Sequence, residues 1–220
     1  MQFETPNPIT AVLDIPAGRV QFIAADRSDT VVEILPADAS KGRDVKMAEQ
    51  TRVGYADGVL RIEGSARNQF LGASGSVQVT VKLPTGSQVE AKAASADFRA
   101  VGRFGDVAFE GSHGSVKVDE AASVRLTTAA GDVSVGRLNG PAEISTEMGD
   151  IRVAEAVRGT VELRTKDGEV SVGAAAGVSA SLDAGTSHGR IRNALRNTEG
   201  TTDLAIHATT ARGDIVARSL

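Results

Sequence analysis

The segment Thr146-Glu-Met-Gly-Asp-Ile-Arg-Val153 contains the motif from which the architecture of the whole chain can be predicted. A threonine is followed three positions later by a glycine and an acidic residue, and aliphatic residues then recur at every second position. The same Thr-x-x-Gly pair begins at Thr128, Thr146, Thr165, Thr186 and Thr210, and the paired glycines lie 18, 19, 21 and 24 residues apart. A loose repeat of about this length is typical of a solenoid.

Aliphatic residues flank each Thr-x-x-Gly pair with a period of two, which is the pattern of strands with one buried face. Two residues before the threonine lie Leu126, Ile144, Leu163, Ala184 and Ala208. Two residues after the glycine lie Val133, Ile151, Val170, Ile191 and Ile215. A glycine accepts backbone conformations that a sharp corner needs. Each copy therefore predicts two short strands joined at a corner, and a further copy without the threonine surrounds Gly114.

The repeats predict an all-β, single-chain parallel β-solenoid. One coil of about eighteen residues cannot offset its ordering cost of about 1.5 kcal/mol per residue, so the coils must stack. The handedness rule for crossovers favours a right-handed coil. We expect residues 89–220 to form the coils as one continuous domain. Residues 1–88 fall outside the repeat frame and predict an N-terminal β-rich cap.

Within the expected cap, two local patterns are specific. Residues 53–62 predict a hairpin across Ala56-Asp57-Gly58, because two short alternating runs flank a turn sequence. Residues 40–50 predict one short helix, for which Asp44 is the expected N-cap.

The composition of the chain argues against several classes of function. Aromatic residues make up only 3% of the chain and hydrophobic residues 41%, as suits a narrow interior filled by small aliphatic side chains. The net charge of −4 argues against binding to nucleic acid, which requires cations to neutralise phosphates. There are no cysteines, so disulfides and thiolate chemistry are excluded.

Several segments resemble the bacterial putative-adhesin family, a domain of unknown function. They are Ile15-Pro-Ala-Gly-Arg-Val20, Ala48-Glu-Gln-Thr-Arg-Val53, Val81-Lys-Leu-Pro-Thr-Gly-Ser87 and the ending Ala208-Thr-Thr-Ala-Arg-Gly-Asp-Ile215. The last segment and the Gly-Asp-Val/Ile repeats are similar to the actinobacterial branch. The resemblance covers nearly the whole chain and implies a β-solenoid. It implies no catalytic residues and no cofactor, so we expect a non-enzymatic scaffold or interaction protein.

Stacking would align equivalent residues of successive copies into ladders. Three positions before the threonine stand Arg125, Glu143, Glu162, Asp183 and His207. Glu162, Asp183 and His207 have side chains that can bind a divalent cation, which makes a cation-binding module one alternative function. The favoured interpretation is a solvated face, on which like charges point into water.

A second ladder follows the corner glycines and consists of Asp132, Asp150, Glu169, Arg190 and Asp214. Paired carboxylates can serve a carbohydrate-active β-helix enzyme, a lyase or a hydrolase, and this is the other alternative. Turn geometry explains these corner residues more simply, because the chain has few aromatic rings on which a sugar could stack. We therefore assign no catalytic residue.

Phe70 and Leu71 are apolar residues in a Gly/Ser-rich loop, and they are the candidate contact for a partner. The sequence thus predicts a protein partner or self-association. The N-terminus lacks the basic and apolar regions of a secretory signal, and no apolar run is long enough for a transmembrane helix. These features predict a cytoplasmic protein.

Overall fold

The computed structural model describes residues 1–64, 75–197 and 201–220, and it forms an all-β solenoid with one short helix. The chain divides into two compact units, Met1–Gly114 and Ser115–Leu220. The elements of the first unit are β1 (Gln2–Glu4), β2 (Thr10–Ala25), β3 (Asp29–Pro36), α1 (Gly42–Gln50), β4 (Arg52–Ala56), β5 (Val59–Glu63), β6 (Val77–Pro84) and β7 (Gln88–His113). Those of the second unit are β8 (Val116–Thr127), β9 (Val133–Leu138), β10 (Ala142–Ser145), β11 (Ile151–Ala156), β12 (Gly159–Arg164), β13 (Val170–Ala174), β14 (Ala180–His188), β15 (Ile191–Ala194), β16 (Leu204–Arg212) and β17 (Ile215–Ser219).

The coils of the second unit stack in the register that the repeat predicts. Val133 of β9 pairs with Ile151 of β11, and Ile151 pairs in turn with Val170 of β13, all in parallel. On the other side of the coil, Ile144 of β10 pairs with Leu126 and Leu163. The parallel β-solenoid is therefore confirmed, with the Thr-x-x-Gly pair at the corner between the two sides.

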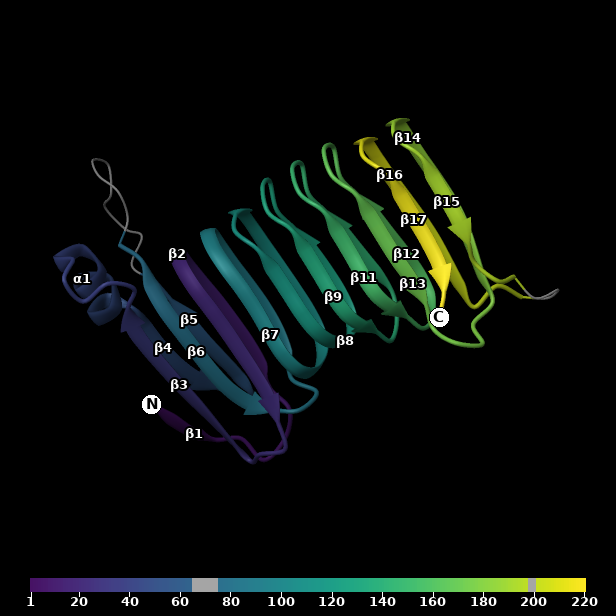
Figure 1. The fold of residues 1–220 in the computed structure, drawn as a ribbon. Helices are drawn as coiled ribbons and strands as arrows, with labels where there is room; N and C mark the ends of the chain where they lie inside the picture. Colours follow the sequence, from purple (N-terminus) through teal and green to yellow (C-terminus); the bar gives the residue numbers. More distant parts are fainter. Residues whose placement is uncertain (65–74, 198–200) are drawn as a thin grey trace. The chain divides into compact units, whose positions relative to one another are not determined.

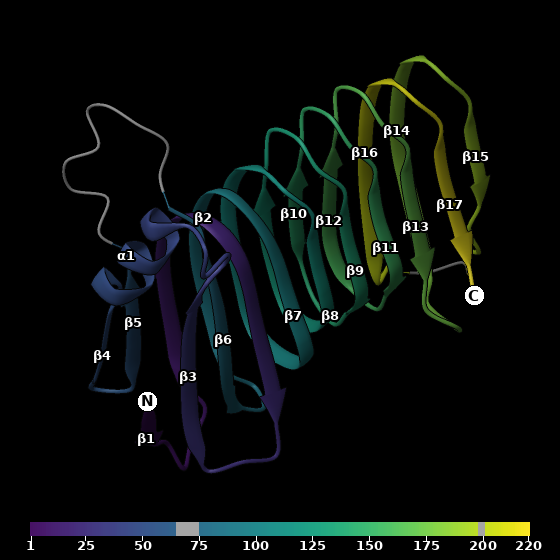
Figure 2. The same ribbon diagram turned by 60° about the vertical axis from the view of Figure 1, so that its left-hand side comes forward.

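The order of the coils in space differs from their order in the sequence. Strand β16 pairs with both β12 and β14, and β17 pairs with both β13 and β15. The last coil of the chain, which we call the inserted coil (β16 and β17), thus lies between the two coils that precede it (Figures 1 and 2). The coil of β14 and β15, which we call the terminal coil, ends the stack of this unit.

Aliphatic side chains fill the interior of the second unit in continuous columns. Leu126, Ile144, Leu163 and Ala208 follow one another along one column, and each is at most 1% exposed. Each large aliphatic side chain contributes about 1.5–3 kcal/mol when it is fully buried. Neighbouring coils bury one another's columns, so the stack supplies the stability that a single coil lacks.

The first unit also contains stacked coils. Strand β2 pairs in parallel with β5 and β6 along one edge and with β7 along the other, so the first coil of the sequence again lies inside the stack. Its core contains phenylalanine rings, whereas residues 115–220 contain no Phe, Tyr or Trp. Phe98 packs against Phe22 and Phe109, with ring centroids 5.9 and 4.9 Å apart.

Antiparallel strands and the helix form the N-terminal β-rich cap. Strand β3 pairs with β1 and β6, and β4 pairs with β5, all antiparallel (Figure 2). The predicted hairpin is confirmed, with positive φ angles of 51° at Asp57 and 77° at Gly58. The predicted N-cap is wrong. The helix begins at Gly42 after Lys41, and Asp44 is instead buried in the first turn, where it accepts a hydrogen bond from the backbone N–H of Ser76.

Residues 88–113 form β7 within the first compact unit, where β7 pairs with β2. The expected division into a cap of residues 1–88 and one domain of coils from residue 89 stays a prediction. In the described ranges, no helix is long and apolar enough to cross a membrane.

Candidate interaction surface at the terminal coil

The threonines of the repeat join each corner to the next. The hydroxyl of Thr165 donates to the carbonyl oxygen of Gly149 at 3.1 Å, and that of Thr210 donates to Gly168 at 3.1 Å. Thr186 of the terminal coil donates to Gly213 of the inserted coil at the same distance. These bonds follow the order in space, so the threonine has a structural task in each of these coils.

The glycines of the repeat are needed for close approach between corners. A Cβ atom at Gly168 would collide with the carbonyl oxygen of Gly149, and one at Gly213 would collide with that of Gly168. Any larger residue would push neighbouring coils apart and would break the strand pairing on both sides of the corner.

The acidic residues after the glycines also hold the corners together. One carboxylate oxygen of Asp132 accepts the backbone N–H of Asp150 at 3.0 Å, and Asp150 accepts that of Glu169 at 2.7 Å. Asp214 accepts the backbone N–H of Arg190 at 2.9 Å. These carboxylates are committed to backbone hydrogen bonds between coils, which is a structural use of the residues considered for acid/base chemistry.

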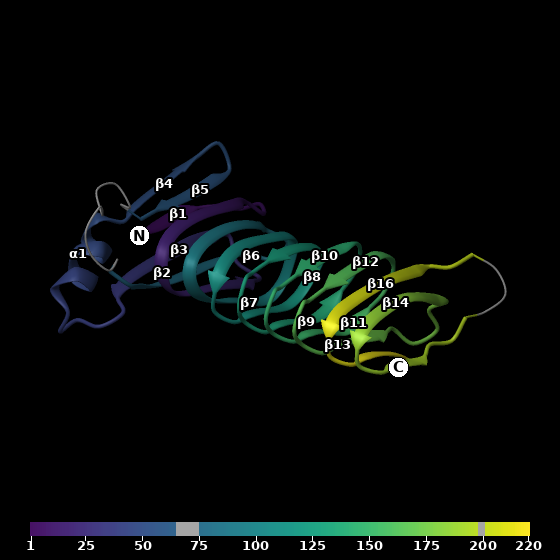
Figure 3. The same ribbon diagram turned by 90° about the horizontal axis from the view of Figure 1, so that it is seen from above.

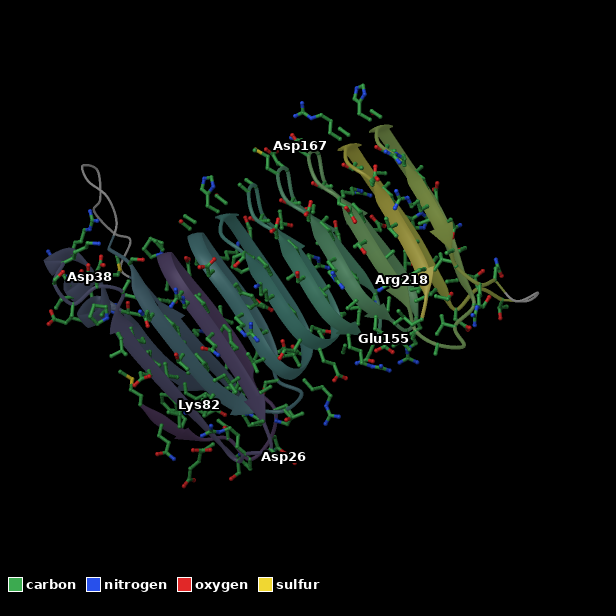
Figure 4. All side chains as sticks on the ribbon, in the orientation of Figure 1. Asp26, Asp38, Lys82, Glu155, Asp167 and Arg218 are labelled. Carbon is green, nitrogen blue, oxygen red and sulfur yellow. The ribbon has the colours of Figure 1, made fainter. Side chains whose placement is uncertain are left out.

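Exposed ion pairs continue along the outside of the same corners. Lys166 pairs with Glu147 and Arg212 with Asp167, each at 2.6 Å, and Asp167 lies at the tip of its corner (Figure 4). Exposed pairs of this kind stabilise a fold by only about 0–1 kcal/mol each.

The structure brings the three candidate metal ligands together in an unexpected order. His207 pairs directly with Glu162 on one neighbouring strand and with Asp183 on the other, because the inserted coil separates the two carboxylates. The Nδ1 atom of His207 lies 3.5 Å from a carboxylate oxygen of Asp183, while Glu162 is paired with Arg164 at 2.7 Å. In the part of the chain that the structure describes, no group of three or more such ligands is arranged to hold a metal ion.

The terminal coil exposes a core position that every other coil of the unit buries. Val133, Ile151, Val170 and Ile215 are each at most 1% exposed, whereas Ile191, which pairs with Ile215, is 46% exposed. Within the described ranges, β14 pairs in register with β16 alone and β15 with β17 alone, and Figure 3 shows β14 beyond β16 at the end of the unit. The far edge of β14 is partly covered, because the backbone N–H of Ala180 donates to the carbonyl oxygen of Arg196 at 3.1 Å, whereas no described strand pairs with the far edge of β15. This end of the unit presents both apolar surface and unpaired backbone groups.

Three arginines surround this exposed end. Arg190, Arg192 and Arg196 are exposed, and none of their guanidinium groups has an ion-pair or hydrogen-bond partner among the described residues. In contrast, Arg164 and Arg212 of the neighbouring coils both have carboxylate partners. The terminal coil therefore combines an open strand edge with unneutralised positive charge, which suits binding of a β-strand by edge addition.

One feature of the sequence indicates this surface, although the repeat pattern does not reveal the order of the coils in space. The copy that forms the terminal coil has Ala184 and Asn193 at positions where most copies have larger aliphatic residues. A polar, weakened copy is typical of the last coil of a solenoid. The other predicted contact, Phe70 and Leu71, lies outside the described residues.

Comparison with known proteins agrees with the fold. A model of the family Toastrack DUF4097 matches residues 13–218. The chain belongs to this family. No curated protein matches this Toastrack chain in sequence.

Three solved structures are similar to the Toastrack chain over nearly its full length. A putative cell adhesion protein from Clostridium sporogenes is 10% identical, with a TM-score of 0.41, and the match covers 100% of this chain and 98% of that one. A putative adhesin from Bacteroides fragilis is 11% identical, with a TM-score of 0.47 and coverage of 99% and 95%. A putative adhesin from Parabacteroides distasonis is 12% identical, with a TM-score of 0.44 and coverage of 98% and 95%. These values concern the fold alone.

Proposed function

We propose that this Toastrack chain is a non-enzymatic scaffold that binds a protein partner through the open edge of its terminal coil. The observation that carries the proposal is the 46% exposure of Ile191, at a position that is buried in every other coil of the unit. A partner strand that pairs with β15 would cover Ile191 and satisfy the backbone groups of the free edge.

The chemistry of the surface supports binding over catalysis. A carbohydrate-active enzyme needs two carboxylates beside a bound sugar. Here Asp132, Asp150 and Asp214 accept backbone hydrogen bonds at the corners, and residues 115–220 contain no aromatic residue on which a sugar could stack. A cation site at Glu162, Asp183 and His207 has less support, because Glu162 is engaged by Arg164. The cytoplasmic location expected from the sequence stays a prediction.

The experiment compares three immobilised forms of the chain as baits in an extract of the source cells. They are the intact chain, an Ile191→Glu/Arg192→Glu variant of the terminal coil, and an Arg152→Glu control. Arg152 is exposed on β11 and has no ion-pair partner among the described residues. We expect a protein that the intact chain and the control capture equally and the terminal-coil variant loses. The captured protein is then purified and its binding to the three forms measured. If no captured protein depends on the terminal coil, the proposal is wrong.

A further inference from the structure

We propose that the partner of the terminal coil is a second copy of this chain, which binds the arginine-rich strand in a groove of its N-terminal cap. The inference rests on the proposed function and names the partner. It follows from a groove in the first unit whose shape, free backbone edge and charge match residues 190–196.

The groove lies between α1, β3 and β4 and has a volume of about 450 Å³. Its lining is mixed: the apolar residues Met1, Val31, Val32, Ile34, Ala48 and Val53 lie beside the polar residues Thr51, Glu33 and Glu49. A volume of this order is within the range of ligand-binding clefts in proteins. We call it the cap groove.

A free strand edge borders the cap groove. Strand β1 covers β3 only at Asp29, Thr30 and Val31, and Met1 exchanges backbone hydrogen bonds with Val32. Beyond Met1, no described strand pairs with this edge of β3, whose other edge is occupied by β6. An extended segment can therefore continue the line of β1 along residues 33–36.

The cap groove carries negative charge. Glu33 and Glu49 are both exposed, and neither carboxylate has a cationic or hydrogen-bonding partner in the described ranges. In contrast, Glu155 of the second unit is paired with Arg137 at 2.6 Å. Among the described residues that line the groove, the amino group of Met1 is the one cation, and it donates to the carbonyl oxygen of Val32. The charge of the groove thus favours a basic occupant.

Apolar and charged side chains alternate along β15 in the same way as along the free edge of β3. On β3, Val32 is buried and Ile34 half-buried, whereas Glu33 between them is exposed. On β15, Ile191 continues the apolar column and Arg192 points to the outer face. If the two edges pair, Ile191 extends the apolar side of β3 and Arg192 lies beside Glu33. Opposite charges on neighbouring strands stabilise such a pair.

The contact joins two different surfaces, so it is heterologous, and an open assembly keeps one unused groove at one end and one unused terminal coil at the other. Heterologous contacts produce rings or open chains of copies. Contacts between like surfaces are disfavoured, because two terminal coils would bring Arg190 and Arg192 against their own copies.

The test is sedimentation of the purified full-length chain over a range of concentrations, at salt of about 50 mM and about 500 mM. We expect association beyond the dimer at low salt and its loss at high salt. A groove variant, Glu33→Arg/Glu49→Arg, and a coil variant, Arg190→Glu/Arg192→Glu, should each associate at least roughly tenfold more weakly than the natural chain. An equimolar mixture of the two variants should associate again, because each basic groove then meets an acidic coil.

A control variant, Glu90→Arg/Arg152→Glu, reverses two exposed charges that belong to neither surface, and it should associate as the natural chain does. Circular dichroism of each variant checks that the fold is intact. The inference is overturned if the natural chain stays monomeric, if either reversal alone leaves association unchanged, or if the mixture does not associate. If the chain is monomeric but another protein is captured only by baits with an intact terminal coil, the proposed function stands. In that case only the identity of the partner is wrong.

Discussion

At the scale of single residues, the threonine and acidic positions of the repeat form hydrogen bonds that link the corners of neighbouring coils. Threonine supplies a hydroxyl to the carbonyl of the neighbouring glycine, and the acidic residue accepts a backbone N–H from the next coil. The threonine bonds are partly buried, and each contributes about 0.5–1.5 kcal/mol, whereas the bonds to the carboxylates are exposed. The motif residues therefore have a structural role, and residues with a binding function are expected in the copies that depart from the motif.

The threonines allow a matched pair of substitutions with opposite outcomes. Thr165→Val removes a donor to Gly149 and should lower the free energy of unfolding by about 1 kcal/mol. Thr128 is 3% exposed and its hydroxyl has no hydrogen-bond partner among the described residues, so Thr128→Val should be neutral or stabilising. Chemical denaturation of the two variants checks the prediction. Equal losses of stability in both would contradict the role assigned to the hydroxyl.

Asp38 gives a prediction on pH. Hydrogen bonds from the Ser40 hydroxyl and then from the Ser40 backbone N–H, with a smaller contribution from Lys41, lower the pKa of Asp38 from 3.8 to about 2. A carboxyl whose pKa is lower in the folded state stabilises the fold above its ordinary pKa, and this stabilisation is lost as pH falls from 3.8 through 2. Ser40→Ala should raise the pKa of Asp38 in an NMR titration, and Lys41→Ala should raise it less. The reverse order would show that the hydroxyl is not the main cause.

At the scale of elements, the strands, corners and registers follow from the sequence, but the order of the coils does not. Each copy has the same frame, so β12 offers an equally suitable edge to β14 or to β16. Periodicity cannot distinguish these alternatives. The helix cap was wrong for a related reason: Asp44 fits a local capping pattern, yet its carboxylate is used by the distant Ser76. The terminal-coil surface was predictable only in part, through Asn193 and the neighbouring arginines.

Engineered disulfides test the order of the coils directly, because the chain has no cysteines of its own. Thr160 and Ser181 both pair with Ala205, from opposite sides. Each of them is therefore on a strand next to that of Ala205, while Thr160 and Ser181 are two strands apart. Thr160→Cys/Ala205→Cys and Ser181→Cys/Ala205→Cys should therefore form disulfides. Thr160→Cys/Ser181→Cys should stay reduced, since strands two apart are separated by about 9–10 Å. Mass spectrometry after mild oxidation distinguishes these outcomes, and efficient formation of the third disulfide would indicate stacking in sequence order.

At the scale of the whole molecule, the two compact units each have a buried core of their own. Leu163→Ala in the second unit should cost about 2–5 kcal/mol, because Leu163 is fully buried. We expect hydrogen exchange to speed up in residues 115–220 and to remain slow in the strands of residues 1–114. Val79→Ala in the first unit provides the reverse comparison. Uniform loss of protection across the chain in both variants would mean that the units unfold as one.

The position of the inserted coil determines where a protein fused to the C-terminus would emerge from the stack. Leu220 follows β17, which has a neighbouring coil on each side, so a fluorescent protein or an affinity tag fused there emerges from within the row of coils. Such a fusion leaves the open rim of β14 and β15 accessible. By the same topology, a gene that gained repeats after residue 220 would not simply extend the stack beyond β15. New coils at that rim would have to arise by duplication inside the gene, between the codons for β13 and those for β16.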